Sequence, residues 1–155
     1  MGADIHIYAE KKLKDGSWST FSTFPTISLR AYGVPVEEGK SDSAWPAAGN
    51  RDYAFFAALA CVRGHGPEPR GIPEDVSPLV AEEYEGWGQD AHSGSWYSVE
   101  EFLPIYLEHK FPEEAVQLVG GHTTKERLIY QHFGMDVWDE GGTLDHYRFV
   151  FWFDN

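Results

Sequence analysis

The sequence predicts an α+β fold with a small antiparallel or mixed sheet and about four to five helices. Three observations support this prediction: an alternating segment and hairpin turn near the N-terminus, capped helical segments in the middle, and an apolar strand at the end. A chain of 155 residues is the usual size of one domain. We therefore expect residues 1–155 to form a single domain.

The N-terminal segment has the pattern of a hairpin. Apolar and polar side chains alternate in "ADIHIYAE", residues 3–10, as they do in a strand with one buried face. Asp15-Gly16 is a preferred pair for a tight hairpin turn, so we expect the return strand at about residues 17–24. The Pro-, Gly- and Ser-rich stretch 25–48 predicts an irregular loop.

Helices are predicted from their capping residues. The first begins at Asn50, runs to about Arg63 and stops at Gly64, and its nearly uniform apolar character predicts burial. The others are, in chain order, a short helix from Ser77-Pro78 to Tyr84, a helix opened by the capping box Ser98–Glu101, a helix from Pro112 to Gly120, and a helix opened by Thr123–Glu126 and ending at Gly134.

The last segment, "HYRFVFWFDN" at residues 146–155, is apolar on both faces. Such a pattern is typical of a strand in the middle of a sheet. The Gly- and Ser-rich segment 86–98, "GWGQDAHSGSWYS", is predicted to be a loop that offers an imidazole, hydroxyls and an indole to a small ligand.

The composition excludes several classes of partner. The formal net charge of −13 argues against general nucleic-acid binding, which needs many cations, and against an anionic membrane surface. No apolar run approaches the roughly 20 residues of a membrane span, and the N-terminus lacks the pattern of a secretory signal. Cys61 is the only cysteine, so a reducing cytoplasm is expected, and its apolar neighbours predict a buried thiol.

Three of the few arginines, Arg51, Arg63 and Arg70, bracket the first helix and the loop after it. Arg63 would complement the helix dipole at the C-terminal end, but this reason does not apply to the other two. In so acidic a chain these guanidinium groups are either buried salt-bridge partners or a clamp for phosphate or carboxylate. The residues alone leave both interpretations open.

Candidate metal ligands are scattered along the chain. Asp4 and His6 would point to the same face of the first strand, and Asp90 and His92 are close together in the predicted loop. The alternative is an aspartate at a strand end with a hydrogen-bonded histidine, and a loop held by a packed tryptophan and local Asx and Ser turns. Four other histidines have no partner at a spacing that would indicate a site, and they are predicted to be surface groups: His65, His109, His132 and His146.

Several segments together resemble a family of small proteins encoded by bacteriophages and prophages. These segments are "MGADIHIYAE" at 1–10, "GNRDYAFFAALACVRG" at 49–64, "EPRGIPEDVS" at 68–77, "WGQDAHSGSW" at 87–96 and "FVFWFDN" at 149–155. The family pattern carries over onto Asp4, His6, Arg51, Tyr53, Arg63, Arg70, Asp90, His92, Ser95, Trp96 and Asp154. Gly94 departs from it, since the family has a histidine between the two serines.

The resemblance implies a phage accessory protein in the cytoplasm of an infected bacterium. By analogy, such proteins counter host defence by binding or destroying nucleotide signals. We therefore expect a protein that sequesters a small phosphate-bearing, nucleotide-derived ligand, and more than one subunit is expected to enclose it. The expected ligand-binding residues are Arg51, Tyr53, Arg63, Arg70, His92, Ser95 and Trp96.

Two alternatives remain open. In the first, the protein is a hydrolase of the same ligand class: Asp4, His6, Asp90, His92 and Asp154 hold a divalent metal, with Asp90 and His92 as the candidate catalytic pair. In the second, it is a structural or interaction protein with no small ligand. No cofactor is firmly implied by the sequence.

Overall fold

The computed structural model describes residues 3–22, 27–28, 43–44, 52–133, 135 and 144–154, and the statements below concern these residues. Arg51, the predicted cap Asn50 and the predicted stop Gly134 lie outside them, as does most of the predicted loop 25–48.

A four-stranded antiparallel sheet forms the centre of the fold, in the order β2-β1-β6-β5. Its strands are β1 (Asp4–Lys12), β2 (Trp18–Ser22), β5 (His92–Ser98) and β6 (Tyr147–Asp154). A separate pair is formed by β3 (Ile27–Ser28) and β4 (Ser43–Ala44). The predicted hairpin and the central position of the last strand are confirmed, because β6 lies between β1 and β5.

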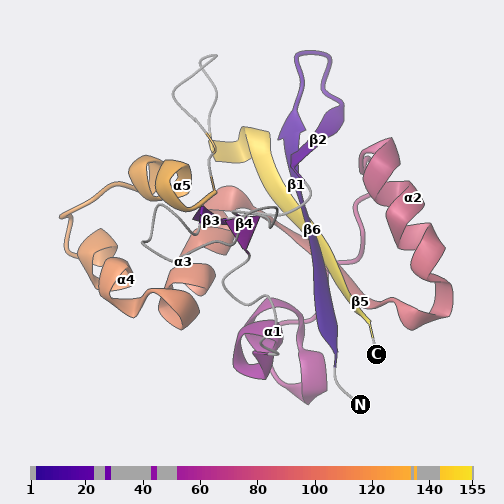
Figure 1. Cartoon of the computed structure of the whole chain (residues 1–155), viewed down its shortest axis with the longest axis horizontal. Coiled ribbons are helices and arrows are strands. Elements are labelled where there is room, and N and C mark those ends of the chain that lie inside the picture. The colour runs from indigo at the N-terminus through magenta and orange to yellow at the C-terminus, as the bar shows by residue number, and fades with distance from the viewer. Residues whose placement is uncertain are drawn as a thin grey trace, which may run out of the picture.

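Five α-helices accompany the sheet in the described ranges, which confirms the predicted α+β class. They are α1 (Tyr53–Ala60), α2 (Pro78–Trp87), α3 (Val99–Lys110), α4 (Pro112–Val119) and α5 (Lys125–Phe133). Figure 1 shows α2 on one side of the sheet and the other four helices on the opposite side.

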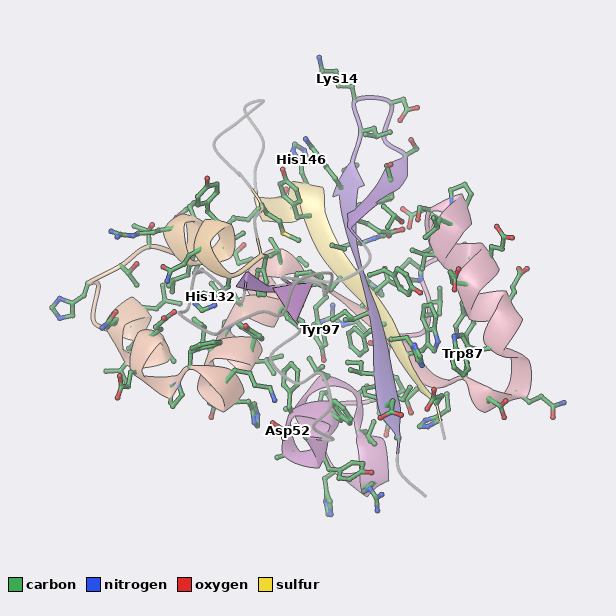
Figure 2. The ribbon with its side chains drawn as sticks, in the orientation of Figure 1. Lys14, Asp52, Trp87, Tyr97, His132 and His146 are labelled. Carbon is green, nitrogen blue, oxygen red and sulfur yellow. The ribbon has the colours of Figure 1, made fainter. Side chains whose placement is uncertain are left out.

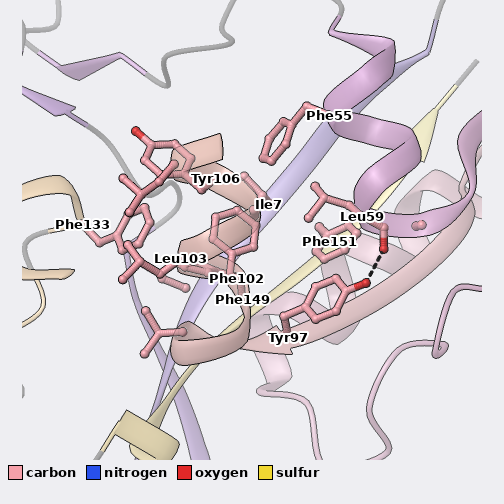
Figure 3. Packing of buried hydrophobic residues seen from close by; sticks show 14 of the residues in the cluster. Ile7, Phe55, Leu59, Tyr97, Phe102, Leu103, Tyr106, Phe133, Phe149 and Phe151 are labelled. Carbon is pink, nitrogen blue, oxygen red and sulfur yellow. Dashed lines mark hydrogen bonds between the residues drawn. The ribbon is translucent and has the colours of Figure 1, made fainter. Parts of the chain in front are cut away.

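The two faces of the sheet bury two different sets of side chains. Toward α1, α3 and α5 lies a large aromatic core, to which β6 contributes Phe149, Phe151 and Phe153 (Figure 3). In the same core the hydroxyl of Tyr97 donates a hydrogen bond to the Leu59 carbonyl at 2.7 Å. Toward α2 lies a smaller cluster built on Val80, Val150 and Trp152, with half-buried aromatic rings around it. β6 is therefore apolar on both faces because both are covered.

The capping residues predicted from the sequence agree largely with the structure, with some shifts of boundary. The capping box of α3 is present: Ser98 Oγ accepts from the Glu101 N–H, and the Glu101 carboxylate accepts from the Ser98 N–H. The cap of α1 is Asp52 and that of α5 is Thr124 rather than Thr123.

The C-terminal end of the first helix differs from the prediction. The helix ends at Ala60, because Cys61 adopts a left-handed conformation with φ of 56°. Arg63 follows in a short 3-10 turn, also at positive φ, so it does not sit in the last turn of α1. The thiol of Cys61 belongs to a half-buried residue, so the prediction of a buried thiol is too strong.

Two further predictions are wrong. The sequence predicts a loop over segment 86–98, but the second half of this segment is β5. His132 is predicted to be a surface group, yet it is 1% exposed and pairs with Glu114 of α4. This pair lies where α4 and α5 meet beside α3, among the rings of Tyr106 and Phe111.

Candidate functional site

A groove of about 690 Å³ lies at the end of the sheet where β1 and β5 finish and β2 and β6 begin. This is the end of the sheet next to the β1–β2 hairpin, whose tip is marked by Lys14 in Figure 2. We call it the tryptophan groove. Its lining residues are Lys12, Trp18, Pro73, Glu74, Asp75, Trp96, Ser98, Glu101, Asp145, Tyr147 and Arg148.

An ion cluster around the buried pair of Arg148 and Glu10 supports one wall of the groove. Arg148 of β6, with its side chain 5% exposed, donates from Nε to the fully buried carboxylate of Glu10 at 2.8 Å. Its Nη1 donates to Asp75 at 2.9 Å. The second oxygen of Glu10 accepts from the backbone N–H of Ser77, which precedes α2, at 2.7 Å. The cluster thus ties the sheet to the segment that leads into α2.

Trp18 covers this cluster. The guanidinium carbon of Arg148 lies 3.9 Å from the centre of the Trp18 ring, and the indole N–H donates to Asp75 at 3.1 Å. Burial alone would raise the pKa of Asp75, but the hydrogen bond and charge of Arg148, with the Trp18 hydrogen bond, lower it below its ordinary value. Asp75 therefore remains ionised beside the groove at neutral pH.

Arg70 supports the other side of the groove. Its guanidinium donates to both oxygens of Glu101, at 3.1 and 2.6 Å, and to the Trp96 carbonyl at 3.2 Å. Its backbone N–H donates to the buried hydroxyl of Ser95 at 3.0 Å. The hydrogen bond from Arg70 lowers the pKa of the Glu101 carboxyl. Arg70 is thus a salt-bridge partner, although the pair is exposed and not buried as one of the two sequence interpretations had it.

The predicted ligand-binding residues fall into separate groups. Arg70, Ser95 and Trp96 lie together at the edge of β5, whereas Arg63 stacks on the Tyr53 ring at 4.0 Å beside α1. Among the predicted binding residues that the structure describes, Trp96 alone lines the tryptophan groove. Arg63 and Arg70 therefore contact different residues and neither is part of the groove lining, while Arg51 lies outside the described residues.

His6 and Asp154 form a pair at the opposite end of the sheet. Nε2 of His6 lies 2.8 Å from Asp154 Oδ2, and the imidazole packs against the Trp87 ring at 4.3 Å. Asp4 lies next to them, because it pairs with Asp154 across the two strands. Figure 2 shows Trp87 on α2, next to this end of the sheet.

His92 is on the other face of the sheet from His6. It lies opposite Phe153 in the register and stacks on that ring, whereas His6 lies opposite Trp152. An irregularity between His92 and Ser95 shifts the register and causes this change of face. In the described part of the chain, no three His, Cys, Asp or Glu side chains are grouped so that they could hold a metal ion.

A second cavity, of about 370 Å³, lies between α3 and α4. Its lining is apolar except for Glu108, and it is bordered by the exposed side chains of Val116 and Val119. It has few polar groups that could orient a ligand, in contrast to the tryptophan groove.

Comparison of the chain with models of protein families, with curated proteins and with solved structures found no match. None of the helices in the described ranges has the length and apolar character to cross a lipid bilayer.

Sequence reasoning missed Trp18, Asp75 and Arg148, which line the groove, and the buried Glu10 that pairs with Arg148. Glu10 and Arg148 are 138 positions apart, so no local spacing could pair them. The available signal was Arg148 itself, a charge in a strand that is otherwise apolar on both faces. Such a residue is buried when both faces are covered, and it then requires a buried anion.

Proposed function

We propose that this protein binds a small nucleotide-derived ligand in the tryptophan groove and sequesters it without transforming it. The observation that supports this proposal best is the aromatic lining of the groove, to which the half-buried Trp18 and Trp96 belong. Stacking of a base on an aromatic side chain contributes about 1–3 kcal/mol. The volume of the groove is within the range of about 300–1,000 Å³ that is usual for small-molecule sites.

In this proposal the arginines do not clamp a phosphate, which is the role that the sequence led us to expect. Arg70 and Arg148 are held by carboxylates, so they shape the groove around the tryptophans rather than clamp a phosphate. Lys12 lines the groove and has no hydrogen-bond or ion-pair partner among the described residues, so it is our candidate to meet a phosphate at the rim.

Binding is favoured over metal-dependent hydrolysis by the positions of the candidate ligands. His6 and Asp154 are on one face of the sheet and His92 is on the other, so these side chains do not face a common point. They also belong to the end of the sheet opposite the groove. The phage origin, the role against host defence and the shared interface between subunits remain parts of the proposal that rest on the resemblance.

The test is calorimetric titration with AMP, GMP, CMP and UMP, followed by heat denaturation and chromatography of the mixture. We expect binding of at least one nucleotide and its recovery intact. Trp18→Leu should weaken binding about tenfold or more, since 1.4 kcal/mol corresponds to a factor of ten. Trp87→Leu is the matched control, because Trp87 is also half-buried but lies at the other end of the sheet.

Two results would contradict the proposal. One is no heat of binding with any of the four nucleotides at millimolar concentration. The other is a cleaved product that forms only when a divalent metal is added, which would favour the hydrolase.

A further inference from the structure

We propose that the base bound in the tryptophan groove is guanine, a purine that has hydrogen-bond acceptors on one edge and adjacent N–H donors on another. This inference rests on the proposed function and names the ligand class of the same site. It follows from the charges that line the groove and from one buried donor.

The groove has more carboxylates than cations. Among the described residues that line it, four are acidic and two are basic. Asp75 and Glu101 are engaged by arginines, whereas Glu74 and Asp145 are exposed and have no hydrogen-bond or ion-pair partner in the described ranges. Carboxylates repel a phosphate and accept hydrogen bonds from N–H groups. The part of the ligand inside the groove should therefore be rich in donors, with the phosphate outside.

Arg148 requires the opposite kind of group from the ligand, a hydrogen-bond acceptor. Its Nε and Nη1 are bonded to Glu10 and Asp75, but Nη2 is buried and has no hydrogen-bond partner among the described residues. A buried donor without an acceptor is costly, and such a group calls for an explanation. An acceptor on the ligand would satisfy it. Because Trp18 lies over the guanidinium, we expect this ring to move when the ligand binds.

Guanine meets both requirements on one flat ring system. Its O6 and N7 atoms accept hydrogen bonds from arginine, which is the commonest specific contact of this base. Its N1–H and 2-amino groups are adjacent donors that match a carboxylate, here Glu74 or Asp145. Uracil and cytosine present fewer donors along one edge, and adenine has no imino hydrogen.

The experiment compares GMP with IMP, which lacks only the 2-amino group, by calorimetric titration. A hydrogen bond to a charged group contributes about 1.5–3 kcal/mol, so we expect GMP to bind at least tenfold more tightly. At least one of the variants Asp145→Asn and Glu74→Gln should reduce the preference for GMP over IMP to about threefold or less. Glu68→Gln is the matched control, since Glu68 is also an exposed acid but does not line the groove. Circular dichroism checks that each variant is folded.

The outcomes separate the inference from the function on which it rests. Nucleotide binding that Trp18→Leu weakens, but with equal affinity for GMP and IMP, overturns the guanine assignment and keeps the proposed function. A GMP preference that both carboxylate variants retain also overturns it. Binding of spermidine without binding of any nucleotide overturns both.

Discussion

Replacing Glu10 by alanine tests the ion cluster on which the groove is built. The fully buried carboxylate accepts from Arg148 and from the Ser77 N–H, and the methyl group of an alanine would offer no acceptor to either donor. Removing one partner of a buried ion pair costs about 3–5 kcal/mol when the remaining charge is left uncompensated. Arg148 would keep the exposed Asp75 as a partner, so we expect a loss near the lower end of this range, about 3 kcal/mol. This loss is a large share of the roughly 5–15 kcal/mol of a typical domain.

The assay is urea denaturation followed by tryptophan fluorescence. Glu82→Ala is the matched control: Glu82 is an exposed acid on α2, and its loss should change the free energy of unfolding by no more than about 0.5 kcal/mol. The double variant Glu10→Met with Arg148→Met should recover most of the loss, because it removes both charges and fills the space with apolar atoms. A loss below about 1 kcal/mol for Glu10→Ala would refute the reasoning that this pair is buried and mutually dependent.

Three other predictions follow from single contacts. Tyr97→Phe should lower the free energy of unfolding by about 1 kcal/mol in urea denaturation, because the Leu59 carbonyl loses its buried donor; an unchanged midpoint would contradict this contact. Gly66→Ala should destabilise the protein far more than Gly64→Ala, since both residues have positive φ but only at Gly66 would the added Cβ lie 1.8 Å from the Ala57 carbonyl oxygen. The strain at Gly64 should cost about 1–2 kcal/mol, and equal thermal shifts for the two variants would be inconsistent with the structure. The third concerns Glu101. Arg70 holds the pKa of the Glu101 carboxyl below its ordinary value of 4.5, so the ionised carboxylate stabilises the fold above pH 4.5. This stabilisation is lost as the pH falls through the lowered pKa. The stability difference between the wild type and Arg70→Gln should therefore shrink between about pH 6 and pH 3, and a difference that does not vary with pH would exclude the ion pair as its source.

The fold could be predicted from the sequence where a local pattern determined the structure. The β1–β2 hairpin, the capping box of α3 and the apolar β6 each depend on residues close together in the chain, and these three predictions are confirmed. The hairpin strands are joined by residues 13–17 rather than by a tight turn at Asp15-Gly16 alone. β5 was missed because glycine and serine occupy its first half. The hydroxyl of the fully buried Ser95 accepts a hydrogen bond from the backbone N–H of Arg70, so a polar residue can occupy a core position.

The candidate site was harder to predict because it depends on distant contacts. The alternation of β1 placed His6 and Glu10 on one face, but it could not show that Arg148 would neutralise Glu10. The bulge before Ser95 moved His92 to the opposite face, and one extra residue in a strand is not visible from composition. Tertiary pairing therefore decided which charged side chains lie in the groove and which support it.

The most direct test of the central claim is an NMR titration that follows the indole N–H signals of the tryptophans. Each signal is assigned by a single tryptophan variant, and the protein is titrated in turn with AMP, GMP, CMP and UMP. The account predicts that a bound nucleotide shifts the signals of Trp18 and Trp96 while those of Trp87 and Trp152 stay in place. Shifts confined to Trp87 and Trp152, or no shift at saturating concentration, would show that the groove is not the binding site.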